Sequence, residues 1–225
     1  MRPREAIFFK FYYLDFMLGL AKLYRSDSDA ESYLQSYTLQ FGGRHYLKEA
    51  YQKIAWSRLL AGDKLGYEQY LQRLLKKGVL VLESDKKAQK EAQGKRVPQP
   101  DLLRARLLFD GGYSDKAQQC LEKLVVGNFA DATDQTEFLY RMGRIAQKKN
   151  ELKKALGYYS QCYAMGGKLP AYFACSAALQ SGIIYEETQN KAMARVMYGR
   201  CLGLQPEDYG DSLHQKAKAG LARLR

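Results

Sequence analysis

Hydrophobic residues recur at intervals of three and four along most of the chain. Tyr51, Ile54, Ala55 and Leu59 show the spacing, which places them on one face of a helix. Alternation typical of half-buried strands is missing, and the one short candidate, VLVL at 79–82, is too isolated to start a sheet. The pattern therefore predicts an all-α protein.

Turn-forming residues interrupt this helical pattern at intervals typical of helix-turn-helix pairs. The interruptions are SDSD at 26–29, FGG at 41–43, AGD at 61–63, DGG at 110–112, KKN at 148–150, GG at 166–167 and TQN at 188–190. Segments of this length between breaks predict helical hairpins.

One arrangement of small and aromatic residues recurs in the second half of the chain. From Gly182, the chain reaches Tyr185 after three positions, Ala194 after nine more and Tyr198 after a further four, with Pro206 beyond. The same steps begin earlier in the chain at Gly143, and earlier still at Ala105. The corresponding residues are Ala146, Ala155, Tyr159 and Cys162 in the copy from Gly143, and Leu108, Ala117, Leu121 and Leu124 in the copy from Ala105.

This pattern resembles the tetratricopeptide repeat, in which small residues let two helices approach and aromatic residues fill the space beside them. The resemblance implies an α-α superhelix, a solenoid of about five helical hairpins. The phrases LLRARLLFDGGYSDKA (102–117) and SLHQKAKAGLARL (212–224) also resemble the Iml2 and tetratricopeptide-39 group. The residues expected to pack the repeats are Gly143, Ala155, Tyr159, Gly182, Tyr185, Ala194, Tyr198 and Pro206.

The spacing from Ala105 to Gly143, and from Gly143 to Gly182, is a few positions longer than the period usual for this family, which implies longer helices or loops. Upstream, the resemblance weakens. We expect two divergent hairpins in residues 1–78, an insertion or linker in 79–100, and three repeats with a C-terminal capping helix in 101–225, all in one continuous solenoid.

A solenoid of this type lines its concave wall with the first helix of each pair, so the resemblance implies a peptide-binding groove there. Arginines in such a wall would bind carboxylates, and aromatic rings would cover apolar side chains. The sequence therefore predicts a protein-binding scaffold with a partly basic groove for an acidic extended peptide. The expected wall residues are Leu102, Arg106, Phe109, Tyr140, Arg144, Gln147, Lys148, Ile183 and Glu186.

Charge adds an alternative. The 36 Lys and Arg residues exceed the 24 Asp and Glu residues, which gives a net charge of +12 and favours acidic partners. Binding of nucleic acid or an anionic membrane is the second interpretation, and the basic C-terminal residues Lys216, Lys218, Arg223 and Arg225 support it. No nucleic-acid-binding signature accompanies them.

Catalytic and metal-binding motifs are missing from the sequence. His45 and His214 lie in no metal-ligand spacing, and no phosphate-binding loop or nucleophile motif occurs. We therefore expect no enzyme activity, cofactor or metal. The four cysteines, Cys120, Cys162, Cys175 and Cys201, form no C-x-x-C pair and are typical of core positions. They favour a cytoplasmic protein slightly, and an exported one fits if Met1 is not the natural start.

The N-terminal segment MRPREAIFFKFYYLDFMLGLA at 1–21 predicts an amphipathic helix. Lys10 and Asp15 interrupt its apolar residues, so the sequence predicts no transmembrane segment. The stretch FFKFYYLDFM at 8–17 would form an exposed apolar edge. This edge supports a third interpretation, in which the chain is a self-associating structural module.

Overall fold

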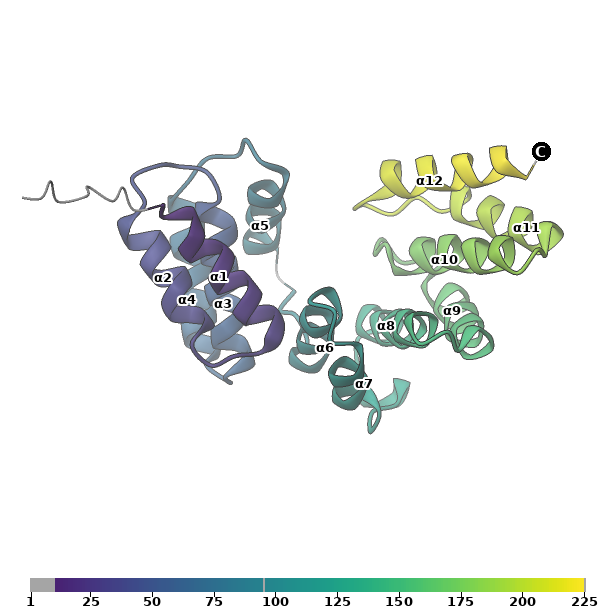
Figure 1. The fold of residues 1–225 in the computed structure, drawn as a ribbon, viewed down its shortest axis with the longest axis horizontal. Helices are drawn as coiled ribbons and strands as arrows, with labels where there is room; N and C mark the ends of the chain where they lie inside the picture. Colours follow the sequence, from purple (N-terminus) through teal and green to yellow (C-terminus); the bar gives the residue numbers. More distant parts are fainter. Residues whose placement is uncertain (1–10, 95, 225) are drawn as a thin grey trace, which may run out of the picture. The chain divides into compact units, whose positions relative to one another are not determined.

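The computed structural model describes residues 11–94 and 96–224. These residues form twelve α-helices, one short 3-10 helix and no strand, which confirms the expected all-α class. The chain divides into two compact units, the first ending at Gly111 and the second beginning at Gly112. Figure 1 labels the helices of both units.

Unit 1 contains six helices, in which α1 packs on α2 and α3 packs on α4 as hairpins. Helix α5 lies against α3 and α4, and α6 lies against α1 and α3. The helices are α1 (Tyr13–Arg25), α2 (Ala30–Gln40), α3 (Leu47–Leu60), α4 (Lys64–Lys76), α5 (Glu83–Gln93) and α6 (Pro100–Asp110).

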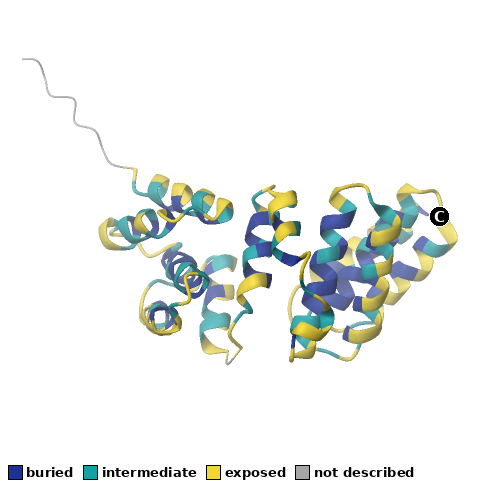
Figure 2. Ribbon diagram, turned by 90° about the horizontal axis from the view of Figure 1, so that it is seen from below, coloured by how far each residue is buried: buried dark blue, intermediate teal, exposed yellow. Residues whose placement is uncertain are grey.

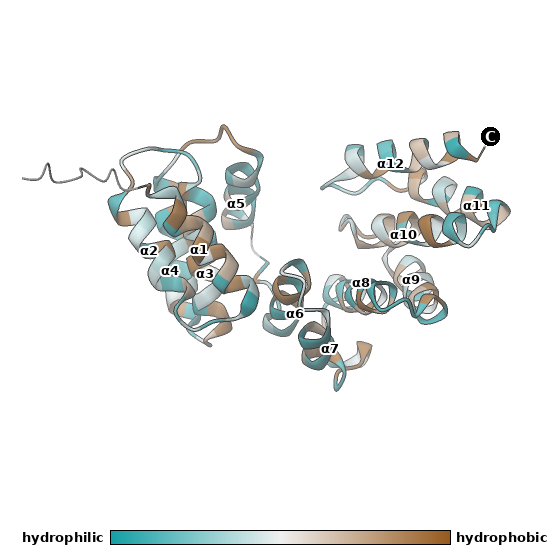
Figure 3. Cartoon of the chain, viewed as in Figure 1, coloured by the Kyte–Doolittle hydropathy of each residue, from teal (hydrophilic) through white to brown (hydrophobic). Residues whose placement is uncertain are grey.

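Unit 2 is a stack of helices in which α8 pairs with α9, and α10 pairs with α11. Helix α10 also contacts α8, α9 and α12, and hydrophobic residues lie along much of it (Figure 3). Buried residues follow the faces on which the helices meet (Figure 2). The elements are α7 (Ser114–Leu121), η1 (Val126–Asn128), α8 (Ala132–Lys148), α9 (Leu152–Gly166), α10 (Phe173–Glu187), α11 (Lys191–Leu202) and α12 (Gly210–Arg223).

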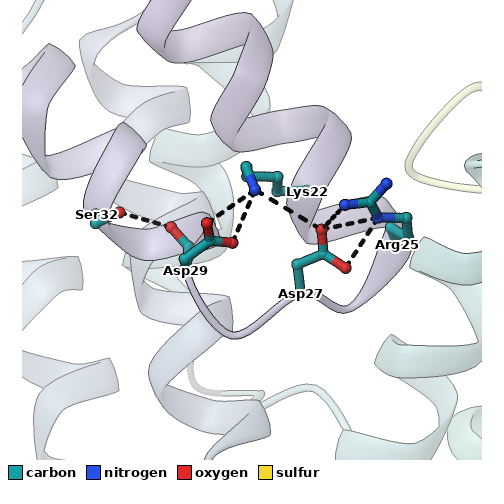
Figure 4. A network of polar contacts seen from close by, with 5 residues as sticks. All are labelled: Lys22, Arg25, Asp27, Asp29 and Ser32. Carbon is teal, nitrogen blue, oxygen red and sulfur yellow. Dashed lines mark hydrogen bonds and ion pairs between the residues drawn. The ribbon is translucent and has the colours of Figure 1, made fainter.

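The expected turns all fall at helix ends or between helices, and side chains close several of them. At SDSD, the Lys22 ammonium donates to both carboxylate oxygens of Asp29 and lies 3.9 Å from the carboxylate of Asp27, which also binds Arg25 (Figure 4). The Ser32 hydroxyl donates to the backbone oxygen of Asp29. These side-chain contacts add to the backbone hydrogen bonds that close the connection between α1 and α2.

The glycines of the repeated pattern lie under tyrosine rings. A Cβ atom on Gly143 would overlap the ring of Tyr159, and one on Gly182 would lie 2.5 Å from the ring of Tyr198. The second ring also touches Gly220 of α12, where an added Cβ would again lie 2.5 Å away. Any side chain larger than hydrogen would therefore displace a fully buried aromatic ring.

The hydroxyl group of each of these two tyrosines donates a hydrogen bond to the first helix of its hairpin. The Tyr159 hydroxyl donates to Gln147 Oε1 at 2.7 Å, and the Tyr198 hydroxyl donates to Glu186 at 2.5 Å. The step from Tyr159 to Tyr198 equals the step from Gln147 to Glu186, and both equal the step from Gly143 to Gly182. The sequence period is therefore a period of contacts in the α8–α9 and α10–α11 hairpins.

The other expected packing residues lie in or beside the cores of the same two hairpins. Ala155 and Ala194 are completely buried in α9 and α11. Tyr185 is partly exposed and packs against the core that contains Tyr198, and Pro206 is partly exposed in the turn before α12.

The boundary between the units differs from the predicted start of the repeat region at residue 101. Helix α6 belongs to unit 1, because Leu103 and Leu107 enter the hydrophobic core that contains Trp56 of α3. The repeat copy expected from Ala105 is consequently divided, since its second half, with Leu121, lies in α7 of unit 2.

Residues 79–100 are not only a linker, because they contain helix α5. Asp85 of this helix is completely buried, and its carboxylate accepts hydrogen bonds from the backbone nitrogens of Tyr46 and Glu49 at 2.9 and 3.0 Å. The first turn of α3 is thus capped by a residue from α5. Within the described residues the expected N-terminal helix begins at Tyr13, and positions 1–10 of the predicted segment lie outside those residues.

Candidate ligand-binding surfaces

In unit 1, two cations gather around one indole ring. The Lys53 ammonium lies 3.7 Å from the ring centroid of Trp56, and the guanidinium carbon of Arg106 lies 4.5 Å from it. Lys53 and Trp56 belong to α3, and Arg106 comes from α6. The electron-rich face of the indole attracts both cations, an interaction that strengthens when water is excluded.

Carboxylates lie at the edge of this cluster. Glu91 of α5 accepts hydrogen bonds from Gln52 Nε2 and Trp56 Nε1, both at 2.6 Å. Glu49 lies 3.9 Å from the ammonium of Lys53, which itself donates to Gln52 Oε1 at 3.1 Å. The indole ring and the amide of Gln52 are thereby fixed in orientation.

Burial lowers the pKa of Lys53. The residue is 7% exposed, and loss of hydration lowers the pKa to about 8, with a further lowering by the nearby charge of Arg106. Glu49 and Glu91 raise the pKa and offset part of this effect. The ammonium form is therefore held at neutral pH against a substantial cost of desolvation.

Arg106 has an unsatisfied donor. Its Nη2 atom is buried and has no hydrogen-bond acceptor among the described residues. Leaving a buried donor without a partner costs about 1–3 kcal/mol. An acceptor brought by a ligand or by water would remove that cost.

In unit 2, helix α8 holds two arginines against aromatic rings from α8 itself and from the start of α10. The buried pair of Glu137 and Arg141 has a nitrogen-to-oxygen distance of 2.9 Å, and the Arg141 guanidinium lies 5.6 Å from the ring of Tyr140. Arg144 Nη1 donates to the hydroxyl of Tyr140 at 3.1 Å. The ring of Tyr172 lies edge-on to Tyr140 at 6.2 Å. These contacts fix both guanidinium groups in place.

The structure divides the expected wall residues into four groups. Leu102 is 0% exposed and Tyr140 is buried, so neither offers its side chain to a ligand, because both pack in the core. Phe109 and Ile183 are partly exposed, and Lys148 is exposed. Arg106 and Arg144 lie in the two clusters just described, in different units.

The last two wall residues have internal partners. Gln147 accepts the hydroxyl of Tyr159, as described above. Glu186 accepts the hydroxyl of Tyr198 and also pairs with Arg223 of α12 at 2.7 Å. These bonds lower the pKa of Glu186 to about 2, with Arg223 the larger cause and Tyr198 the next. Both residues are thus engaged in packing rather than directed at a ligand.

The basic C-terminal group is also partly engaged. Arg223 is the partner of Glu186, while Lys216 and Lys218 are exposed on α12. Arg225 lies outside the described residues. His214 Nε2 lies 2.8 Å from the backbone oxygen of Leu204, and His45 is exposed.

Sequence reasoning missed the residues around which both clusters form. The packing of α5 on α3 brings Glu91 to Lys53 and Trp56. In the sequence, Arg141 resembles any other solvated charge on a helix. One signal was present. Trp56 is the single tryptophan of the chain, and it lies three positions after Lys53 on the same helical face.

A cavity of about 450 Å³ lies between two turns of unit 2. The turns meet where the Glu207 nitrogen donates to the oxygen of Pro170 at 2.9 Å. Its walls are formed by residues 166–171 and 203–207, with Ala174 and Cys175 of α10.

Within the described part of the chain, no group of three or more His, Cys, Asp or Glu side chains could hold a metal ion. No helix in that part is both long enough and apolar enough to cross a membrane.

No protein-family model and no curated protein matches the sequence. Among solved structures, the crystal structure of BtubC (BKLC) from P. vanneervenii is similar to this chain, with 18% sequence identity and a TM-score of 0.45. The alignment covers 95% of this chain and 87% of that chain. A similarity of this degree assigns no function.

Proposed function

We propose that this protein is a non-enzymatic scaffold of the tetratricopeptide type that binds an acidic extended peptide segment of a protein partner. Support for the fold type comes from the glycine–tyrosine contacts, which recur with the period of the sequence pattern. Support for the binding comes from the Lys53–Trp56–Arg106 cluster of unit 1.

The unsatisfied Nη2 donor of Arg106 is the observation that carries the proposal. A carboxylate fits this place for two reasons. A guanidinium binds a carboxylate through parallel hydrogen bonds, and the ammonium of Lys53 nearby adds a second favourable charge. The buried indole of Trp56 holds both cations in place through the face of its ring.

Trp56 makes the proposal directly testable, because indole fluorescence of this chain reports on that one residue. We would titrate the full chain with an N-acetylated, C-amidated tetra-glutamate peptide and with its tetra-glutamine counterpart. A saturable change in fluorescence with the first peptide, and a much weaker change with the second, is the expected result. Rising salt should weaken the binding.

The variant Arg106→Met removes the unsatisfied donor, and Lys76→Met removes one charge from an exposed position on α4 as its matched control. We expect the first to lose at least tenfold in affinity and the second to bind as the wild type does. Equal affinities of all three proteins, or equal binding of both peptides, would refute the proposal.

A second candidate function is self-association through α1. Phe11, Leu14, Met17 and Leu18 are 70%, 54%, 47% and 39% exposed, and they follow one another along a single side of the helix start. An exposed apolar stripe of this kind is typical of an interaction surface.

A second copy of the chain fits this stripe, because an antiparallel pair of α1 helices would bury the stripe of each copy against that of the other. We expect light scattering to show a concentration-dependent dimer that Leu14→Glu abolishes. A monomer at the highest accessible concentration would refute this candidate.

A further inference from the structure

Cys175 and Cys201 bring two thiols together in the core of unit 2. Cys175 lies in the first turn of α10, and Cys201 lies in the last turn of α11. Their sulfur atoms are 3.4 Å apart, and both side chains are buried. A disulfide has sulfur atoms about 2.05 Å apart, so a shift of about 1.4 Å would join them.

The preceding hairpin provides an internal comparison. The repeat places Thr136 and Cys162 at the positions equivalent to Cys175 and Cys201, so the place of Cys175 is taken there by a threonine. Cys162 Sγ donates to the backbone oxygen of Thr136 at 3.3 Å, and burial raises its pKa to about 12. The packing of the hairpin therefore needs no second thiol at this position.

A cavity adjoins one of the two cysteines rather than both. The cavity of about 450 Å³ between the turns at 166–171 and 203–207 has Cys175 in its wall, whereas Cys201 is not part of it. Cys201 lies deeper, with its sulfur 3.9 Å from the backbone oxygen of Leu213 in α12. A small reagent would meet Cys175 first.

The hydrogen bond between the thiols also makes Cys175 the more acidic of the two. It lowers the pKa of Cys175 and raises that of Cys201. Since a thiolate is the reactive form of cysteine, Cys175, which belongs to the wall of the cavity, is also the cysteine that is more readily converted to that form.

We propose that Cys175 and Cys201 form a redox-active dithiol, which a small hydroperoxide converts into a disulfide between α10 and α11. The Cys175 thiolate attacks one peroxide oxygen, the oxygen–oxygen bond breaks, and the departing hydroxide takes up a proton to leave as water. The sulfur of Cys201 then attacks the sulfenic acid on Cys175. The sulfur–oxygen bond breaks, a second water leaves with the Cys201 proton, and the disulfide forms.

The balance of this reaction is two thiols oxidised by two electrons and one hydrogen peroxide reduced to two waters. A dithiol reductant reverses it by thiol–disulfide exchange. Because the bond would join α10 to α11, oxidation would tie the last hairpin together covalently.

The test is a map of the thiols after oxidation. The reduced full chain is exposed to hydrogen peroxide, free thiols are alkylated in denaturant, and mass spectrometry locates the modified cysteines. We expect the free thiols of Cys175 and Cys201 to disappear together as one cross-linked peptide forms. Their rate of loss should be at least ten times that of the Cys162 thiol. Dithiothreitol should restore both.

Two variants sharpen this result. Cys175→Thr installs the residue of the preceding hairpin, and we expect it to form no disulfide while keeping its helical circular dichroism. The double variant Cys120→Ser/Cys162→Ser retains the pair and should oxidise as the wild type does, which keeps the test valid if Cys175→Thr fails to fold. Oxidation in urea should lose its preference for the pair.

Three outcomes would overturn the proposal. One is persistence of both thiols at peroxide concentrations that fully oxidise glutathione. The others are a cross-link that involves Cys120 or Cys162 in the folded wild type, and a pairing of Cys175 with Cys201 that forms only between two chains.

Discussion

Replacement of Gly182 by alanine tests whether close contact between a glycine and a tyrosine ring sets the geometry of the hairpins. The new methyl group would lie 2.5 Å from the ring of Tyr198, closer than two carbon atoms approach in folded proteins. The ring has little freedom to move away, because Gly220 touches its other edge and its hydroxyl is bonded to Glu186. The strain must therefore be met by a shift of α10, α11 or α12.

Two opposing effects determine the size of the change. Overpacking of a filled core costs about 1–3 kcal/mol. Alanine in the middle of a helix is more favourable than glycine by about 0.5–1 kcal/mol. Gly199 of α11 provides the matched control, because an added Cβ there would meet nothing within 4 Å. The difference between Gly182→Ala and Gly199→Ala then isolates the clash.

Urea unfolding followed by far-ultraviolet circular dichroism measures both variants against the wild type. We expect Gly199→Ala to raise the free energy of unfolding and Gly182→Ala to lower it, with about 1–3 kcal/mol between them. The slope with urea should stay constant, which shows that the compared states are the same. Equal stabilisation by both alanines would refute the contact.

Three further predictions concern packing and charge. Ala194→Leu should overpack the completely buried contact of α11 and lower the free energy of unfolding by about 1–3 kcal/mol, whereas Ala192→Leu on the exposed face should change it little in the same urea assay. The pKa of Lys53 is lowered to about 8, so the unfolded chain binds more protons between pH 8 and the ordinary lysine pKa of about 10.4. The contribution of Lys53 to stability should therefore rise with pH across that window, and Lys53→Met should remove this part of the pH dependence in parallel melts; an identical pH dependence in both proteins would contradict the burial. Arg223 lowers the pKa of Glu186 to about 2, so the stability from this pair is complete above the ordinary glutamate pKa and is lost as pH falls toward 2; Glu186→Gln should flatten the acid limb of the stability curve, and an unchanged limb would count against the pair.

Much of the local structure follows from the sequence alone. Periodicity of three and four predicts helices, and short polar or glycine-containing breaks predict their ends, because both depend on residues close in the chain. The spacing of Gly143, Tyr159, Gly182 and Tyr198 likewise predicts which residues pack within a hairpin. In these hairpins, local spacing and tertiary contact coincide.

Tertiary structure decided which charged residues act together. Asp85 looks like an ordinary charge in a polar segment, and only the packing of α5 on α3 makes it a buried cap. Arg106 gains its indole partner from α3, three helices earlier in the chain, while Glu186 is held by Arg223 from the last helix. Contacts between distant segments leave no periodic trace in the sequence, so the candidate site could be located only after the helices were placed.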